Sequence, residues 1–89
     1  HAVTHALQPV QEFRSIDERL ATLTHREREV LEHVIAGRLN KQFAASLGTV
    51  EKTIKVHRGR MMAKLGVRSV AELVRLADRA GIAPAGNGP

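Results

Sequence analysis

The fold of this chain is decided by residues 40–65, whose sequence is NKQFAASLGTVEKTIKVHRGRMMAKL. Apolar residues recur at helical spacing on both sides of Gly48. The first run predicts a helix of barely two turns with Asn40 as its N-cap, and the second predicts a helix from about Glu51 to Leu65. A short helix joined by a tight glycine-containing turn to a longer basic helix predicts a helix-turn-helix.

The longer helix is expected to have two different faces. At 100° per residue, Ile54, Met61 and Leu65 lie within about 40° of one another and form an inner face. Small or polar residues form the opposite face, namely Lys52, Val56, Gly59 and Ala63, and Lys55 and Arg60 flank it. A slim helix with cations at its edges and an apolar ridge suits the major groove of DNA. The alternative is an ordinary exposed face in a helical bundle.

Three further helices are expected around this unit. Helical spacing after Pro9 predicts a linker helix over about residues 10–21. Capping boxes at Thr24 to Glu27 and at Ser69 to Glu72 predict the starts of two helices that end near residues 36 and 80. No strand-like alternation of useful length occurs, so we expect an all-α bundle of three to four helices with an N-terminal linker helix. Residues 82–89 are expected to form a flexible tail.

Length and charge favour a binding module. Eighty-nine residues suffice for one small domain, and the net charge of +5 indicates an anionic partner. Residues 52–68 carry six basic side chains and no acidic one, which an ordinary solvated helix would not show. A membrane surface is the weaker candidate, because the outer face of the basic helix lacks large apolar residues.

Other function classes find little support in the sequence. The absence of cysteine excludes disulfides, thiolate zinc sites and a cysteine nucleophile, and favours the cytoplasm. We find no phosphate-binding glycine loop and no recognisable catalytic set, so we predict no enzyme activity, no cofactor and no metal. No apolar run is long enough to span a membrane, and no secretory signal is evident. Because the sequence starts at His1, we expect a fragment or a processed product.

Several ordered blocks carry a family resemblance. These blocks are LTHREREVL at residues 23–31, GRLNKQFA at 37–44, LGTVEKTIKVHR at 47–58, MAKL at 62–65 and RSVAEL at 68–73. Over about residues 23–80 the chain resembles the luxR-type helix-turn-helix, most closely that of FixJ/NarL-type response regulators. The resemblance implies that residues 23–81 are the DNA-binding output domain of a transcription regulator, that residues 1–22 are a linker, and that a phosphorylated receiver domain precedes them.

The resemblance also implies partners and site residues. Promoter DNA would be bound by a homodimer on two half-sites, with RNA polymerase as a further candidate partner. By position, Thr53, Lys55, Val56 and Arg60 would face DNA, with Lys55 and Val56 contacting bases. Arg58 or Lys64 would lie nearer phosphates, although the helical wheel points Arg58 toward the core. The expected DNA-binding set, with Lys52 from the outer face, is Lys52, Thr53, Lys55, Val56, Arg58, Arg60 and Lys64.

Some positions leave alternatives open. Val50 stands where the family usually has a capping serine, so the cap is either moved to Thr49 or lost. Gly59 either permits close backbone approach to DNA or removes a base contact. His57 is expected to pack or to form a hydrogen bond rather than to contact a base or ligate a metal.

The last helix has a wider apolar stripe than one core requires. Val74, Leu76, Ala77 and Ala80 would form a dimer seam or, equally, additional contact with the linker helix. The same tri-helical motif occurs in sigma factors and in helical modules that dock on polymerase. That is the alternative function.

Overall fold

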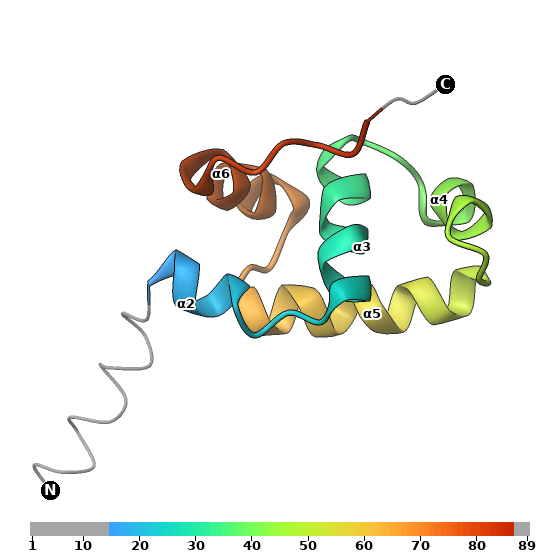
Figure 1. Ribbon diagram of the computed structural model, residues 1–89, viewed down its shortest axis with the longest axis horizontal. Coiled ribbons are helices and arrows are strands. Elements are labelled where there is room, and N and C mark those ends of the chain that lie inside the picture. The colour runs from blue at the N-terminus through green and yellow to red at the C-terminus, as the bar shows by residue number, and fades with distance from the viewer. Residues whose placement is uncertain (1–14, 87–89) are drawn as a thin grey trace, which may run out of the picture.

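The computed structural model describes residues 15–86, and α-helix is the only regular secondary structure in this part of the chain. Its five helices are α2 (Ile16–Leu20), α3 (His25–Ile35), α4 (Asn40–Ser46), α5 (Glu51–Leu65) and α6 (Val70–Ala80). In Figure 1, α5 lies along one side, α3 stands across its middle, α4 lies at its N-terminal end, and α2 and α6 lie at its C-terminal end. The all-α prediction is confirmed. None of the described helices is long and apolar enough to cross a membrane.

Most helix boundaries follow from local sequence signals. The capping box of α3 is formed, because Thr24 Oγ1 accepts from the Glu27 amide at 3.1 Å and the Thr24 amide donates to Glu27 Oε1 at 2.9 Å. Helix α5 has the predicted bounds and ends at Gly66, which adopts the left-handed conformation with φ of 69°. The α6 box is only half formed, because the carboxylate of Glu72 accepts from the Arg68 amide instead of the Ser69 amide.

Two predictions about the helices were wrong. Asn40 is the first residue of α4 and not its N-cap, which is Leu39; the Asn40 side chain instead accepts a hydrogen bond from Arg58. In the linker region, Ser15 is extended and caps α2 in a capping box with Glu18, so the helix predicted over about residues 10–21 is not continuous through Ser15, and α2 begins at Ile16. Residues 10–14 of the predicted linker helix lie outside the described residues.

The core lies where α3 meets α5 and α6. Val30, Leu31, Phe43, Ile54, Met61, Leu65 and Leu73 are fully buried in it. The ring of Phe43 stacks on that of His33, with a centroid distance of 4.9 Å. Because the inner face of α5 packs into this core, its opposite face is exposed to solvent.

Residues 82–86, the described part of the predicted C-terminal tail, contact the rest of the domain. The Ala85 amide donates to the Glu32 carbonyl at 2.9 Å, and Ile82 packs against the core. Arg38 donates one hydrogen bond to the Gly86 carbonyl and another to His33 Nδ1, at 2.7 Å from the ring nitrogen. The tail therefore runs back across the C-terminal end of α3 (Figure 1). Residues 87–89 lie outside the described part.

Candidate nucleic-acid interface

The two faces predicted for α5 are present in the structure. Ile54, Met61 and Leu65 are fully buried. The opposite face is exposed along its length, at Lys52, Val56, Gly59 and Ala63. A Cβ atom placed on Gly59 would have no neighbour within 4 Å, so packing inside the domain does not require glycine there. Apart from Lys52, this outer face is a narrow ridge of small side chains.

Most of the predicted DNA-contacting residues lie on or beside this ridge. Lys52, Lys55, Val56 and Arg60 are exposed, and Thr53 is half-buried at the edge. Lys55 Nζ lies 3.9 Å from Glu51 Oε2, and both side chains are well exposed, so this ion pair contributes little stability. Val56 is 46% exposed and lies beside Lys52 and Lys55 on the same helix. Cations and one apolar side chain are thus presented together.

Arg58 lies apart from this ridge. It is half-buried, and its Nη1 donates to Asn40 Oδ1 at 2.9 Å. The hydrogen bond joins α5 to the first residue of α4 and helps to set the angle between the two helices. The wheel placed the backbone of Arg58 correctly toward the interior. The remaining guanidinium N–H groups are not used by this bond.

Lys64 is joined to the N-terminus of α3. Its Nζ lies 2.7 Å from Glu27 Oε1 and 3.0 Å from the Thr22 carbonyl oxygen. Glu27 is only 2% exposed. Burial alone would raise the pKa of Glu27, but hydrogen bonds from Lys64 and from the Thr24 amide, together with the charge of Lys64, outweigh it and lower this pKa. Lys64 therefore neutralises a carboxylate that the fold has removed from water.

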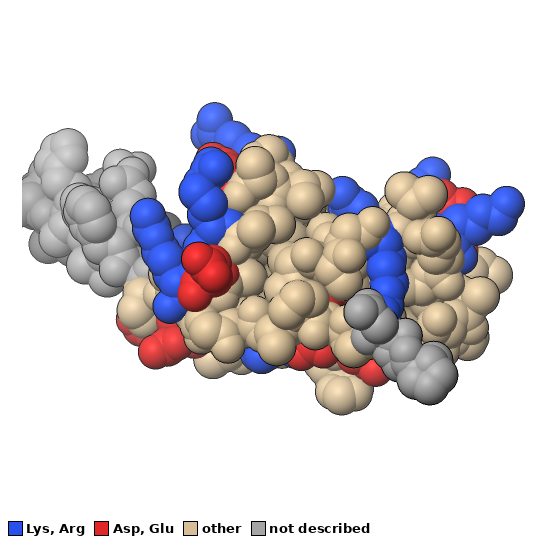
Figure 2. All heavy atoms as spheres, turned by 90° about the horizontal axis from the view of Figure 1, so that it is seen from above, with Lys and Arg blue, Asp and Glu red and all other residues tan. Residues whose placement is uncertain are grey.

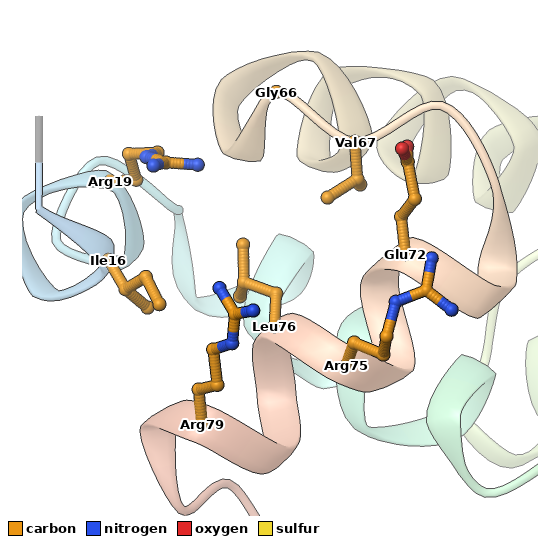
Figure 3. A pocket seen from close by; sticks show the side chains of 8 residues that line it. All are labelled: Ile16, Arg19, Gly66, Val67, Glu72, Arg75, Leu76 and Arg79. Carbon is orange, nitrogen blue, oxygen red and sulfur yellow. The ribbon is translucent and has the colours of Figure 1, made fainter. Parts of the chain in front are cut away.

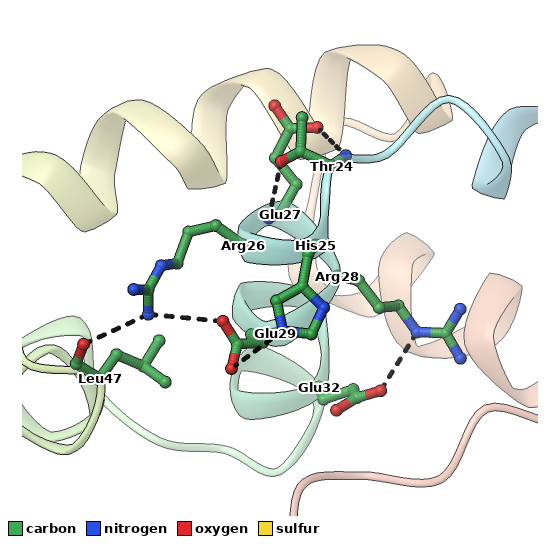
Figure 4. A network of polar contacts seen from close by, with 8 residues as sticks. All are labelled: Thr24, His25, Arg26, Glu27, Arg28, Glu29, Glu32 and Leu47. Atoms are coloured by element: carbon green, nitrogen blue, oxygen red, sulfur yellow. Dashed lines mark hydrogen bonds and ion pairs between the residues drawn. The ribbon is translucent and has the colours of Figure 1, made fainter.

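Other charges around α3 are also paired. Figure 4 shows Arg26 between Glu29 and the Leu47 carbonyl, and Arg28 directed at Glu32. The Arg26 contact connects α3 to the turn that precedes α5, with an Nη1 to oxygen distance of 3.3 Å. These pairs reduce the free positive charge on this side of the domain.

The start of α5 has no side-chain cap. Val50 is the N-cap residue, and no side chain accepts a hydrogen bond there. The structure thus settles one open alternative, because the cap is lost and not moved to Thr49. Val50 is 64% exposed, beside the outer face of α5.

His57 lies between the inner and outer faces and is half-buried. Its Nδ1 is buried and has no hydrogen-bond partner among the described residues. This agrees with packing, whereas the expected hydrogen bond is not formed at this nitrogen.

The four predicted seam residues of α6 lie in different surroundings. Leu76 and Ala77 are buried within the domain, at 7% and 2% exposure. Val74 is 43% exposed and Ala80 is half-buried. Leu76 faces the side of α2 that carries Ile16 (Figure 3), as in the linker-contact alternative. Val74 and Val70, which is 39% exposed, form the outward apolar surface of α6.

Sequence reasoning missed the partner of Lys64. Glu27 was recognised as part of a capping box, but its ion pair joins residues 37 positions apart. No local spacing signals such a contact. The signal available was the position of Glu27 among apolar residues at helical spacing, which predicts a buried carboxylate in need of a cation.

Comparisons with known proteins match this domain to a bacterial protein family. The profile of "Bacterial regulatory proteins, luxR family" matches residues 21–77. The transcriptional regulatory protein FixJ of Azorhizobium caulinodans is 44% identical over 70 residues, which cover 79% of this chain and 33% of that protein. The chain spans about a third of the length of the curated relatives it matches.

Two solved structures share the fold. The response regulator StyR has a TM-score of 0.71 and 41% identity, covering 88% of this chain and 38% of StyR. Full-length FixJ from B. japonicum has a TM-score of 0.69 and 47% identity, covering 74% of this chain and 32% of FixJ. The sequence identity to both proteins is at least 41%, so the similarity extends beyond the fold. The chain therefore belongs to the luxR family of bacterial regulatory proteins, and residues 21–77 are its DNA-binding helix-turn-helix domain.

Proposed function

We propose that this domain binds promoter DNA by placing the outer face of α5 in the major groove. One observation carries the proposal: the inner face of α5 is fully buried, whereas the opposite ridge is narrow, exposed and flanked by cations without strong partners. The major groove admits a helix of this width and offers guanine acceptors to Lys and Arg and thymine methyls to apolar side chains.

Roles follow from position on the helix. Lys55 and Val56 contact base edges, and Thr53, Lys52 and Arg60 contact bases or phosphates beside them. Arg58 and Lys64 already form hydrogen bonds inside the domain, so they reach phosphates only through their remaining N–H donors. We therefore assign phosphate contacts first to Lys52 and Arg60, and to Arg58 and Lys64 in second place.

The domain acts as a homodimer on two half-sites. The exposed part of α6, around Val74 and Val70, supports this proposal. Half-buried Ala80 would lie at the edge of this dimer interface, and the buried residues Leu76 and Ala77 would lie beneath it. Two recognition helices held by one seam would require half-sites about one helical turn of DNA apart.

The proposal extends to the protein as a whole. The relatives are transcriptional regulatory proteins and response regulators. We infer that this domain is the output domain of a cytoplasmic two-component regulator with a receiver domain, that it has no enzyme activity, and that RNA polymerase is a further partner.

The test is a pair of substitutions on opposite sides of the domain. Duplexes selected from a random pool are titrated by fluorescence anisotropy at several salt concentrations. Lys55→Ala should cost about 1–3 kcal/mol of binding free energy and relax the base preference at one position. Arg79→Ala, on α6, removes one charge elsewhere and should leave the preference unchanged.

Two results would contradict the proposal. An unchanged preference in Lys55→Ala would remove Lys55 as a base contact. A wild-type domain that binds no duplex at low salt would favour the alternative, a sigma-factor-like or polymerase-docking module.

A further inference from the structure

A second basic cluster lies away from the proposed DNA interface. Figure 3 shows a cavity between α2, α6 and the loop that follows α5. Its volume is about 220 Å³. Arg19, Arg75 and Arg79 stand around it, while Ile16 and Leu76 form an apolar part of its wall.

Two of the three arginines around this cavity have no polar partner within the described residues. Between residues 15 and 86, the side chains of Arg75 and Arg79 make no hydrogen bond or ion pair. Arg19 Nη1 donates to the Leu65 carbonyl at 3.0 Å, which holds this guanidinium at the rim. The one carboxylate in the lining, Glu72, accepts a hydrogen bond from the Arg68 amide. Arg75 and Arg79 therefore stand at the cavity without an anionic partner among residues 15–86, and the carboxylate in the lining is already hydrogen-bonded.

The cavity opens on a different side from the groove-facing ridge. The ridge of α5 points away from the core, whereas α6 lies on the core side of α5, together with α3 (Figure 1). Figure 2 looks onto that side and shows basic side chains near both of its ends, with acidic side chains beside some of them and a broad uncharged stretch between. A duplex seated on the α5 ridge would leave the cavity accessible.

The chemistry of the lining defines its ligand. Guanidinium groups bind carboxylates through paired N–H donors, and they do so more strongly beside an apolar wall that reduces contact with water. Ile16 and Leu76 offer a surface for an apolar side chain next to that carboxylate. Polynucleotide phosphates would use the charge but not the apolar wall.

We propose that this cavity is a docking site for an acidic, amphipathic protein segment. A Glu or Asp side chain of the segment pairs with Arg75 and Arg79, and a neighbouring apolar side chain packs on Ile16 and Leu76. The site is independent of the DNA interface, so the domain can hold DNA and a protein partner at the same time.

The first experiment uses a blocked hexapeptide of alternating Leu and Glu, titrated into the ¹⁵N-labelled domain and followed by NMR. Saturable shifts of the Gly66, Val67 and Leu76 amides are expected. Replacing Glu by Gln in the peptide should weaken binding by about tenfold or more, because the charge-assisted pairs are lost. Replacing Leu by Ser should also weaken it, which a site for charge alone would not show.

The second experiment uses variants of the domain. Arg75→Gln with Arg79→Gln should weaken the Leu-Glu peptide by about tenfold, whereas Arg68→Gln, a nearby exposed arginine outside the lining, should not. DNA affinity should remain within about twofold in all of these variants. Arg75→Glu with Arg79→Glu should instead favour a Leu-Lys peptide, a reversal that damage to the fold cannot produce.

Three outcomes would overturn the proposal. Inorganic phosphate that causes the same shifts at the same concentrations would indicate a site for small anions. A DNA duplex that shifts these amides would indicate a second phosphate contact. Shifts that do not saturate at about 10 mM peptide would indicate an interaction too weak for a docking site, so no segment docks there.

Discussion

The outer face of α5 and the edges turned to its neighbours use the same residue types in different ways. Lys52 and Arg60 on the outer side have no ion pair within the described residues, and Lys55 has only a long one. On the other side, Arg58 is bonded to α4 and Lys64 to the start of α3. The positive charge of this helix thus consists of a free part, which a ligand can use, and a part that joins the helices.

Among the substitutions of residues on α5, Lys64→Met should change the stability of the domain most. It leaves the carboxylate of Glu27 buried without its cation, which should destabilise the domain by about 3 kcal/mol at pH 7. The free energy of unfolding is measured by urea denaturation. Adding Glu27→Gln to this variant should recover part of the loss, because a neutral amide costs less to bury. A loss below about 1 kcal/mol with clearly weaker DNA binding would instead make Lys64 chiefly a phosphate contact.

The Glu27–Lys64 pair also predicts the direction in which the stability of the wild type changes with pH. The pKa of Glu27 is lowered in the folded state. The carboxylate therefore stabilises the fold at pH values above about 4.3, the ordinary pKa of glutamate, and this contribution is lost as the pH falls through its folded value. Lys64→Met should remove most of this loss of stability at acidic pH.

Val50→Ser tests the N-terminus of α5, where no side chain caps the helix. A serine hydroxyl can accept from the amide three residues on, which no side chain does in the wild type. Because Val50 is 64% exposed, little packing is lost. We expect the domain to gain about 1 kcal/mol in thermal or urea unfolding. Val50→Ala is the matched control, and an equal gain in that variant would show that the hydroxyl does not act as a cap.

Gly59→Ala examines the middle of the outer face. The added Cβ meets nothing within 4 Å, so the higher helix propensity of alanine should stabilise the domain by about 0.8 kcal/mol. Ala63→Gly, one turn along the same face, should lose a similar amount. DNA affinity measured on Gly59→Ala then decides between the two alternatives for this glycine: weaker binding indicates close backbone approach, and unchanged or tighter binding indicates a missing side-chain contact. A variant less stable than the wild type would contradict the expected helix effect.

Local signals made most of the fold predictable, but not its long-range contacts. The bounds of α5 follow from its apolar period and from Gly66, and the start of α3 follows from the Thr24 and Glu27 pair. The ion pair of Lys64 and the return of the tail to Glu32 join residues far apart, for which spacing gives no signal. The N-cap of α4 could not be found for another reason: Asn40 is a good capping residue, but a hydrogen bond to Arg58 competes for its side chain.

The smallest predicted effect concerns another cation that is bonded inside the domain, Arg38. Burial, followed by the charge of Arg38, lowers the pKa of His33, while Glu29 and Glu32 oppose the shift. Because the folded state then binds fewer protons than the unfolded state, stability should fall as the pH drops below about 6.5, the ordinary pKa of histidine. The slope cannot exceed about 1.4 kcal/mol per pH unit, the value for one proton.

The same titration should loosen the tail. A proton on His33 Nδ1 would place two cations at the 2.7 Å contact with Arg38, which also donates to the Gly86 carbonyl. Hydrogen exchange of the Ala85 amide, bonded to Glu32, should therefore quicken in acid beyond the intrinsic pH dependence. His33→Gln should abolish this excess, whereas His25→Gln, on an exposed side chain, should not. Equal acid sensitivity in His33→Gln would mean that Arg38 holds the tail without regard to the charge of its neighbour.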